Sequence, residues 1–359
     1  MAFPRVVRIL ERLTRRPTAP MHEHAVLDEA TAIARGFGAR VSIDRWGNLV
    51  VRPKERRAGP PIWLVAHTDH PGLEVLGRGQ AALLGGVGAR YFHRGLRLRF
   101  YHEGESIPAK LERFSAKKGV CRLRDTPGVR SLRRGDFGVL ELEDFRLSGG
   151  LVHARQLDDL AGSAVSLAVI ERACSRSRLN VHALLTRAEE VGFVGSLGAA
   201  EDGRIPRNAW IINVEASRAL PGVDIGGGPV IRVGDRRTTF PAQAENLLLA
   251  ARDQLPKTRP VQRSLMSGGT CEATVWNLYG YRATGVAVPL GNYHNQGPGN
   301  RLQAETVSAK DLATAVDLIE IAARAPEKAR GRDAVLKNRI DRYLRRYGSR
   351  LQASRPKHL

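Results

Sequence analysis

Short apolar runs that alternate with helix-forming segments are the feature that most restricts the fold of this chain. Four of the runs are typical of buried strands: IWLVA (62–66), NVHALLT (180–186), NAWIINVEA (208–216) and RATGVAV (282–288). Four stretches have the composition and spacing of helices: residues 22–37, 160–174, 241–255 and 306–325. The alternation predicts an α/β fold with a mostly parallel, doubly wound sheet and helices on both of its faces.

Residues 73–150 interrupt this alternation. Glycine is frequent there, LRLRFY and FGVLELEDF have the residue pattern of strands, and no long helix is indicated. We therefore expect a small all-β domain inserted into the sheet domain. The predicted division is 1–72 and 151–325 for the sheet domain, 73–150 for the inserted β domain, and 326–359 for a basic helical tail.

The charge of the chain is strongly positive. Its 57 Lys and Arg against 36 Asp and Glu give a net charge of +21 at pH 7, and part of the excess lies in the tail around AVLKNRIDRYLRRYGSRL. A basic amphipathic segment of this kind can contact nucleic acid, another anionic surface or a partner subunit, and a solvated helix is the alternative interpretation. No zinc finger or RNP-type motif accompanies it, so the sequence gives a nucleic-acid function little support.

The sequence also bears on the compartment. No run approaches 18 consecutive apolar residues, and the basic N-terminal segment lacks the apolar core of a signal peptide, so we expect no membrane span. The three cysteines are widely spaced, which fits neither a disulfide framework nor a cysteine zinc site. These features predict a cytoplasmic protein.

Ionisable residues follow several of the predicted elements at positions where doubly wound sheets bind ligands. They form five segments: His67 with Asp69, Asp158 with Asp159, Glu189 with Glu190, Glu215, and His294. Each segment alone is as well explained by a structural histidine or an exposed acidic loop. Together they supply imidazoles and carboxylates suited to two neighbouring divalent cations. In the adjacent pair, one glutamate can bind a metal while the other moves protons.

The order of the motifs resembles a known family. HTDHPG, LDDLAG, AEEVG, NVEAS, GGTCEATVW and VPLGNYHN resemble the glutamyl and tetrahedral aminopeptidases, which are dinuclear metal-dependent peptidases of clan MH. The resemblance covers roughly residues 20–325 and includes the β insertion. It implies a zinc-exopeptidase-like fold and hydrolysis of peptide bonds by a metal-activated water.

The resemblance also assigns roles to individual residues. It implies His67 and Glu215 as ligands of the first metal, Glu190 and His294 as ligands of the second, and Asp158 as the bridge between them. Asp69 would accept a hydrogen bond from His67. Glu189 would be the general base and later the acid. The implied cofactors are two divalent metal ions per subunit, zinc first, with cobalt or manganese as alternatives.

Two departures from the family pattern keep other substrates open. Glu215 stands where many of these aminopeptidases have aspartate, and GGTCEA replaces the more frequent GGTDA, which puts Cys271 beside the expected pocket. A carboxypeptidase or an N-acyl amino acid deacylase on the same scaffold is therefore the alternative function. A basic, catalytically weak protein that binds an anion or nucleic acid is the third interpretation.

The expected partners follow from the same comparison. A peptide is the expected substrate, and relatives use the β insertion for self-association, so we expect a homo-oligomer formed through residues 73–150. Contact of nucleic acid or another polyanion with the basic tail is a weaker expectation.

Overall fold

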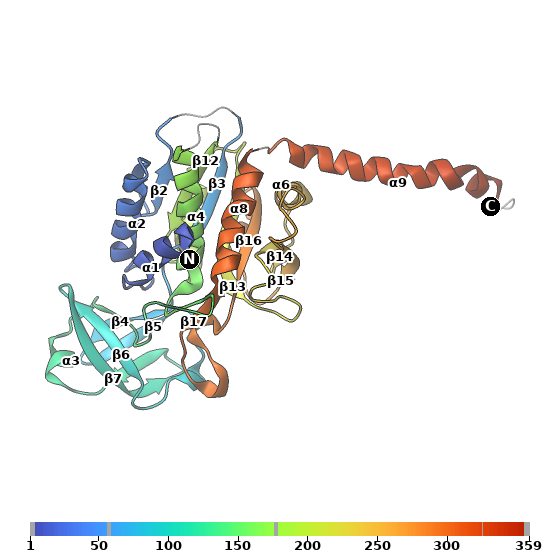
Figure 1. Cartoon of the computed structure of the whole chain (residues 1–359). Coiled ribbons are helices and arrows are strands. Elements are labelled where there is room, and N and C mark those ends of the chain that lie inside the picture. Colours follow the sequence, from blue (N-terminus) through green and yellow to red (C-terminus); the bar gives the residue numbers. More distant parts are fainter. Residues whose placement is uncertain (1–3, 56–58, 176–178, 325, 355–359) are drawn as a thin grey trace.

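The computed structural model describes residues 4–55, 59–175, 179–324 and 326–354. Three bounds of the predicted domains and tail, at residues 1, 325 and 359, lie outside the described residues. Figure 1 shows a body of helices and strands, a smaller β-barrel below it, and a long helix, α9, that leaves the body at the end away from the barrel. The α/β class expected from the sequence is confirmed.

An eight-stranded sheet forms the centre of the body, in the order β1-β2-β12-β3-β13-β16-β14-β15. Its strands are Arg40–Ile43 (β1), Leu49–Arg52 (β2), Ile62–His67 (β3), Val181–Thr186 (β12), Trp210–Arg218 (β13), Val230–Asp235 (β14), Gln262–Met266 (β15) and Arg282–Leu290 (β16). Strands β12, β3, β13 and β16 run parallel, whereas β2 and β14 pair antiparallel with their central neighbours. The carboxyl ends of the four parallel strands therefore lie at one edge of the sheet.

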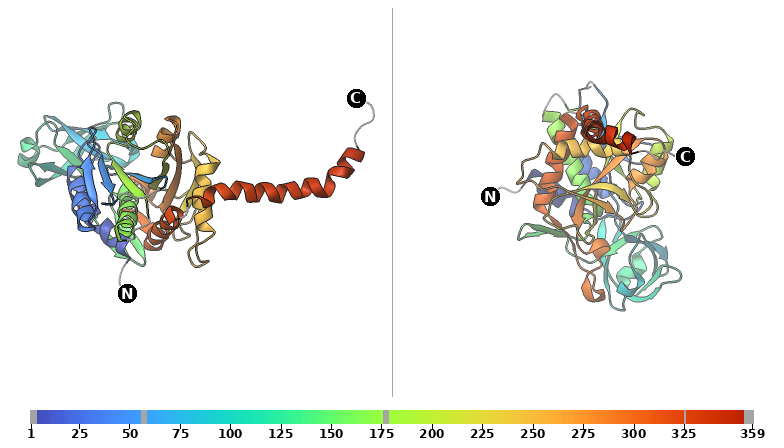
Figure 2. Two further views of the ribbon diagram at one scale, coloured as in Figure 1. Left: turned by 90° about the horizontal axis from the view of Figure 1, so that it is seen from above. Right: turned by 90° about the vertical axis from the view of Figure 1, so that its right-hand side faces the viewer.

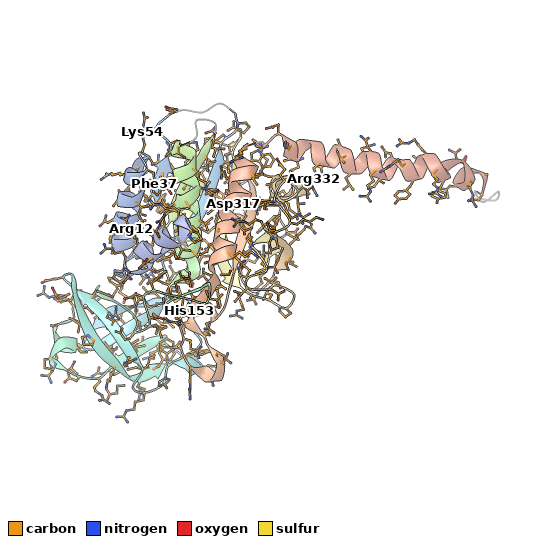
Figure 3. The ribbon with its side chains drawn as sticks, in the orientation of Figure 1. Arg12, Phe37, Lys54, His153, Asp317 and Arg332 are labelled. Atoms are coloured by element: carbon orange, nitrogen blue, oxygen red, sulfur yellow. The ribbon has the colours of Figure 1, made fainter. Side chains whose placement is uncertain are left out.

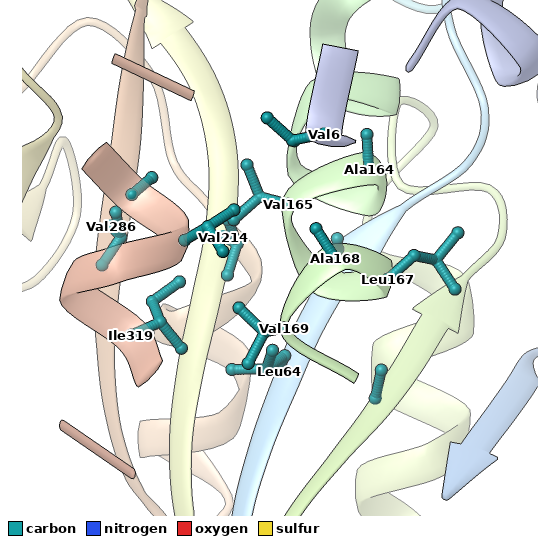
Figure 4. Close-up of a cluster of buried hydrophobic side chains, with 14 of the residues drawn as sticks. Val6, Leu64, Ala164, Val165, Leu167, Ala168, Val169, Val214, Val286 and Ile319 are labelled. Carbon is teal, nitrogen blue, oxygen red and sulfur yellow. The ribbon is translucent and has the colours of Figure 1, made fainter. Parts of the chain in front are cut away.

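Helices cover both faces of this sheet (Figure 1). Those on one face share a large apolar core: Arg5–Thr14 (α1), His24–Gly36 (α2), Leu157–Ser175 (α4), Ala242–Arg252 (α6) and Ala309–Arg324 (α8). Val194–Glu201 (α5) and Glu272–Leu278 (α7) pack on the other face. Figure 4 shows Val165 and Val169 of α4 among Leu64 and Val214 of the sheet. This packing holds the start of α4 against the strand ends.

The smaller unit is a closed barrel with the strand order β4-β5-β8-β7-β6-β9. Its strands are Gly72–Gly77 (β4), Gln80–Leu84 (β5), Arg97–His102 (β6), Glu105–Ser115 (β7), Val120–Leu123 (β8) and Phe137–Leu140 (β9), with the short helix Pro127–Ser131 (α3) beside them. Gly138 allows β9 to cross Phe100, because a Cβ at this position would lie 2.6 Å from the ring. These strands come from the stretch for which the sequence predicts an all-β insertion.

A separate three-stranded sheet, β10-β11-β17, joins two strands that follow the barrel in the chain to one that follows β16. It consists of Arg146–Ser148 (β10), Leu151–Ala154 (β11) and Glu305–Ser308 (β17). Because β11 leads directly into α4 and β17 into α8, this small sheet fixes the approach to the strand-end edge.

The C-terminal tail forms α9, Lys328–Ala353, a helix of 26 residues. The two views in Figure 2 show it extending away from the body. Among the residues that the structure describes, no helix has both the length and the hydropathy to cross a membrane.

Candidate metal centre and active site

The structure brings the predicted site residues together at the carboxyl ends of the parallel strands. His67 ends β3 and is in register with Thr186, which ends the neighbouring β12. The remaining side chains come from separate elements: Asp158 at the start of α4, Glu189 and Glu190 after β12, Glu215 within β13, and His294 in the loop after β16. All of them except Asp69 and His294 line one pocket of about 250 Å³.

The carboxylate of Asp158 lies between two imidazoles. Its Oδ1 is 3.3 Å from Nε2 of His67, and its Oδ2 is 3.6 Å from Nε2 of His294. All three side chains are buried. A carboxylate that presents each oxygen to a different imidazole has the geometry of a ligand shared by two cations.

The two adjacent glutamates approach different histidines. Oε1 of Glu190 is 3.0 Å from Nε2 of His294, whereas Oε2 of Glu189 is 3.9 Å from Nε2 of His67. Two groups of ligand atoms are compact enough to hold an ion: Asp158, Glu190 and His294, and separately His67, Glu189 and Glu190. The first group is the set predicted for the second metal. The second group shares only His67 with the set predicted for the first metal, since it contains Glu189 and Glu190 in place of Asp158 and Glu215.

Asp69 holds the turn that carries both glutamates. Its carboxylate oxygens accept the backbone N–H groups of Glu189 and Glu190, each at 3.0 Å. Nδ1 of His67 lies 3.1 Å from the backbone oxygen of Asp69 and 3.5 Å from its Oδ1. The backbone carbonyl of Asp69 is therefore the nearer partner of the imidazole. The carboxylate of Asp69 instead fixes the backbone of Glu189 and Glu190.

The barrel takes part in orienting His294. Nδ1 of His294 lies 2.6 Å from the backbone oxygen of Gly86, in the loop that follows β5. Because Nδ1 donates to this carbonyl, Nε2 is left unprotonated to face Asp158 and Glu190 when the ring is neutral. His294 itself has φ of 53°, in the left-handed region that side chains seldom adopt. The loop is thus held in an uncommon conformation that places this ring against Asp158 and Glu190.

Sequence reasoning missed Glu305, a buried residue at the start of β17. Its Oε2 accepts the N–H groups of Leu157 and Asp158 at 2.7 and 3.0 Å, and its Oε1 accepts the N–H of His294 at 2.8 Å. One carboxylate therefore ties together the backbones of two ligand segments. A single acidic residue in a short strand carries no sequence signal of this role.

His70, which follows Asp69 in the chain, is a second buried residue that supports the site. It is 1% exposed, and its Nδ1 lies 2.6 Å from the backbone oxygen of Asp158. Its Nε2 lies 3.1 Å from the side-chain oxygen of Asn295. His70 therefore packs behind the bridging aspartate and supports it through the backbone.

Glu215 reaches the pocket but already has a cationic partner. Its Oε2 is 3.2 Å from Nη1 of Arg232, which is buried, and the same guanidinium nitrogen donates to the hydroxyl of Ser217. Burial raises the pKa of Glu215 to about 7, and Arg232 opposes that rise. Oε1 of Glu215 also accepts the Ser217 hydroxyl at 3.4 Å, so both carboxylate oxygens have a partner at the wall of the pocket.

Three side chains of the site, Glu189, His67 and His294, have pKa values above those of the isolated side chains. Burial raises the pKa of Glu189 well above that of an ordinary glutamate, with His67 opposing and Glu190 adding to the rise. Burial lowers the pKa of His67, but Glu189 and Asp158 outweigh it, so the pKa lies well above the usual histidine value. The pKa of His294 is raised in the same way by Glu190 and Asp158, against burial. Imidazoles with these neighbours attract protons, and the same neighbours attract metal cations.

The donor set fits metal ions. Oδ1 of Asp158, Oε1 of Glu190 and Nε2 of His294 are buried, and within the described ranges they have no hydrogen-bond partner. Buried polar atoms without partners are costly, and two divalent cations, one beside each imidazole, would satisfy them. Nitrogen and carboxylate oxygen are ligands that zinc, cobalt and manganese accept.

Comparison with solved structures shows where this fold occurs. A TET aminopeptidase from a marine-sediment Thaumarchaeota archaeon superposes with a TM-score of 0.78 at 19% identity, covering 91% of this chain and 99% of that one. The TET1 peptidase of Pyrococcus horikoshii gives a TM-score of 0.74 at 21% identity, covering 89% and 99%. Aminopeptidase APDkam598 of Desulfurococcus kamchatkensis gives 0.74 at 21% identity, covering 91% and 97%. At these identities the likeness establishes the fold.

Comparison of sequences establishes the family. No curated protein sequence matches the chain. The model of the M42 glutamyl aminopeptidase family matches residues 123–318, which contain most of the ligand segments described above. The chain therefore belongs to the M42 glutamyl aminopeptidase family and is a metal-dependent aminopeptidase.

Proposed function

We propose that this enzyme removes residues from the N-terminus of peptides by means of two divalent cations held around Asp158. His67, Asp158 and Glu215 would bind the first cation, and Asp158, Glu190 and His294 the second. The observation that carries this proposal is the placement of Asp158, whose two oxygens lie 3.3 and 3.6 Å from Nε2 of different imidazoles. Zinc is the proposed metal, with cobalt or manganese as alternatives.

Two bound cations would acidify a water molecule and polarise the scissile carbonyl. Glu189 then accepts the proton from that water as the oxygen attacks the carbonyl carbon. When the C–N bond breaks, Glu189 delivers the proton to the leaving amine nitrogen.

The division of labour between the adjacent glutamates rests on their contacts. Glu190 is the nearer to a histidine, at 3.0 Å from His294, and belongs to the compact group with Asp158. Glu189 stands farther from its histidine, at 3.9 Å, and lines the open pocket. We therefore assign metal binding to Glu190 and proton transfer to Glu189.

Replacement of Glu189 by glutamine tests this assignment. The amide keeps the size of the side chain but cannot accept the water proton, so kcat should fall about 10²–10⁴-fold. Metal content, measured by mass spectrometry of the purified protein, should stay at two ions per subunit. Glu201→Gln, at an exposed position on α5, is the matched control. A Glu189→Gln variant that loses a metal ion would instead make Glu189 a ligand.

The direction of attack can be tested on a mixed peptide pool supplied with zinc, cobalt or manganese. We expect ladders shortened from the N-terminus, as the family match indicates. Ladders shortened from the C-terminus, or loss of acyl groups alone, would support the carboxypeptidase or deacylase function that Glu215 left open.

We also propose that residues 1–72 and 151–325 form one domain and residues 73–150 a second, inserted domain. The chain would assemble through this inserted domain, which contains the barrel. The supporting feature is a hollow of about 880 Å³ on the barrel, lined by groups of both signs: Arg97, Lys110, Arg124, Glu141, Glu143 and Asp144. A surface with both signs can pair with a second copy of itself. The Pyrococcus horikoshii TET1 peptidase assembles into a tetrahedron or an octahedral shell. The cytoplasm is the proposed compartment, in keeping with buried cysteines at 121 and 271.

The charge reversal Lys110→Glu tests assembly through the barrel. Like charges would then face each other across the contact, so sedimentation should show a smaller particle than the wild type. Lys54→Glu, at an exposed position on the body, is the control. An unchanged particle mass in the Lys110→Glu variant would place the contact elsewhere.

A further inference from the structure

The helix α9 is attached to the body only near its start. Side-chain contacts join its first turns to α6: Lys328 to Gln254, Arg332 to Asp253, and Asn246 to Asp333. Farther along, the described side-chain interactions are internal to the helix, such as Lys337 with Asp341 at 2.7 Å. Figure 3 shows side chains standing free along the helix beyond Arg332. More than half of α9 is therefore available to another surface.

The projecting part carries an apolar stripe. It consists of six exposed side chains, three or four residues apart except for the adjacent pair at 343 and 344: Leu336 (55%), Ile340 (55%), Tyr343 (63%), Leu344 (70%), Tyr347 (44%) and Leu351 (71%). At 3.6 residues per turn these positions fall within an arc of about 100°. Scattered apolar residues on a surface need no explanation, but a continuous stripe along a free helix does.

Cations occupy most of the remaining surface of the same segment. They are Lys337, Arg339, Arg342, Arg345, Arg346 and Arg350, against the single acidic residue Asp341. The partner of this helix must therefore offer both negative charge and an apolar layer.

We propose that α9 lies in the interface of an anionic lipid bilayer, with its apolar stripe among the acyl chains and its cations at the lipid phosphates. An amphipathic helix with a basic polar face binds membranes in this way. Tyr343 and Tyr347 suit the boundary between headgroups and hydrocarbon. The long stems of Arg and Lys let their charges reach the phosphates while the helix axis lies lower.

The charges and the stripe argue against two other partners. A second copy of this chain also carries a net charge of +21, so pairing of two such helices would bring like charges together. Nucleic acid would satisfy the guanidinium groups through its phosphates but would leave Leu336, Ile340 and Leu351 in water. A lipid surface supplies both kinds of contact along one side of the helix.

Co-sedimentation of the full-length protein with vesicles tests this. Vesicles of phosphatidylcholine that contain about 30% phosphatidylglycerol have the negative surface of an anionic leaflet and should bind the protein. Vesicles of pure phosphatidylcholine should bind it far less. The triple variant Ile340→Ala, Leu344→Ala, Leu351→Ala keeps helix propensity. It should bind at least about tenfold more weakly, because it loses apolar area.

A second variant separates charge from apolar contact. Arg342→Gln, Arg345→Gln and Arg346→Gln should weaken binding to anionic vesicles by about fivefold per charge. The control Asn338→Ala, on the polar side of the helix, should bind as the wild type does, and circular dichroism should show equal helix content in all variants. Hydrolysis of a free peptide should be unchanged throughout, since α9 leaves the body at the end away from the barrel and none of its described residues lines the pocket.

Three results would overturn the proposal. The first is no difference between anionic and neutral vesicles. The second is an alanine triple variant that binds vesicles as the wild type does, especially if duplex DNA competes fully, which would make α9 a general polyanion site. The third is a change of particle mass in that variant with vesicle binding intact, which would identify a second copy as the partner of the stripe.

Discussion

Glu305 illustrates how one buried carboxylate can organise a site without touching the reacting groups. It accepts three backbone N–H groups, from Leu157, Asp158 and His294. These are backbones next to or within the segments of the proposed bridging ligand, Asp158, and of His294, a proposed ligand of the second metal. Its function is thus to keep the two ligand segments at a fixed separation.

We expect Glu305→Gln to weaken metal binding. The amide retains one acceptor but turns its NH₂ group toward a backbone N–H, leaving a buried donor unsatisfied. The free energy of unfolding should fall by about 1–3 kcal/mol, and metal affinity by about 10–100-fold, as for other residues that support ligands. Competition with a chelator measures the affinity, and Glu112→Gln on the exposed side of β7 is the control. Wild-type affinity in Glu305→Gln would show that the ligands hold their own positions.

The sequence marks the residues that the structure brings together more clearly than the residues that support them. Strand-end position and the family resemblance both single out His67, Asp158, Glu190 and His294, which lie close together in the fold. Glu305 and Arg232 act through burial and through contacts with residues distant in the chain, which one sequence does not display. Nδ1 of His67 lies 3.1 Å from the backbone oxygen of Asp69 and 3.5 Å from its carboxylate. A sequence does not encode so small a difference in distance.

Among the elements, the loop after β5 connects the barrel to the metal centre. The carbonyl of Gly86 accepts from His294, and the side-chain oxygen of Gln296 accepts the N–H of Gly88 at 3.1 Å. The hydroxyl of Tyr91 also donates to the backbone oxygen of Gly297. The barrel loop and the His294 loop therefore hold each other in place.

Gln296→Ala should loosen this connection and weaken one metal position selectively. Affinity at the position of His294 and Glu190 should fall about tenfold, because the acceptor of the imidazole is less well fixed, while the position of His67 keeps its affinity. Calorimetric titration with zinc can resolve the two steps. Gln303→Ala, an exposed neighbour in the same loop, is the control. Equal weakening of both steps would show that the loop acts on the whole site.

Prediction of elements succeeded where the pattern was long. The strands β3, β12, β13 and β16 and the helices α2, α4, α6 and α8 follow apolar runs or helical spacing. Helices α5 and α7 have only 8 and 7 residues, too few for a helical period to stand out. The barrel closes through pairing of β4 with β9, in which Leu73 lies opposite Gly138. Local sequence does not encode a pairing between residues so far apart in the chain.

For the whole molecule, the metal-free protein should lose stability as pH rises. The pKa values of His67, His294, Glu189 and Glu215 are all raised by folding. The native state therefore binds more protons than the unfolded chain, and the free energy of unfolding falls with pH. The loss begins above the usual glutamate pKa of 4.5, continues past about 7 for Glu215, and extends above 6.5 for the histidines.

We expect the Tm of the chelator-treated protein to drop by on the order of 5 °C between pH 6 and 8.5. With zinc bound, the imidazoles are neutral and the carboxylates are paired, so the profile should be flat and Tm higher. Scanning fluorimetry with and without chelator measures both. A metal-free profile that rises over this range would mean that the site is not protonated as described.

The carbonyl of Gly86 also has an evolutionary consequence. A domain inserted in a loop can normally be lost by deletion, because the host closes the gap. Here the deletion would also remove the acceptor that fixes the tautomer of His294, and activity would suffer even if the body folded perfectly. A descendant could shed the barrel only after acquiring another acceptor for that ring. We therefore expect descendants that keep the peptidase activity to keep the barrel as well.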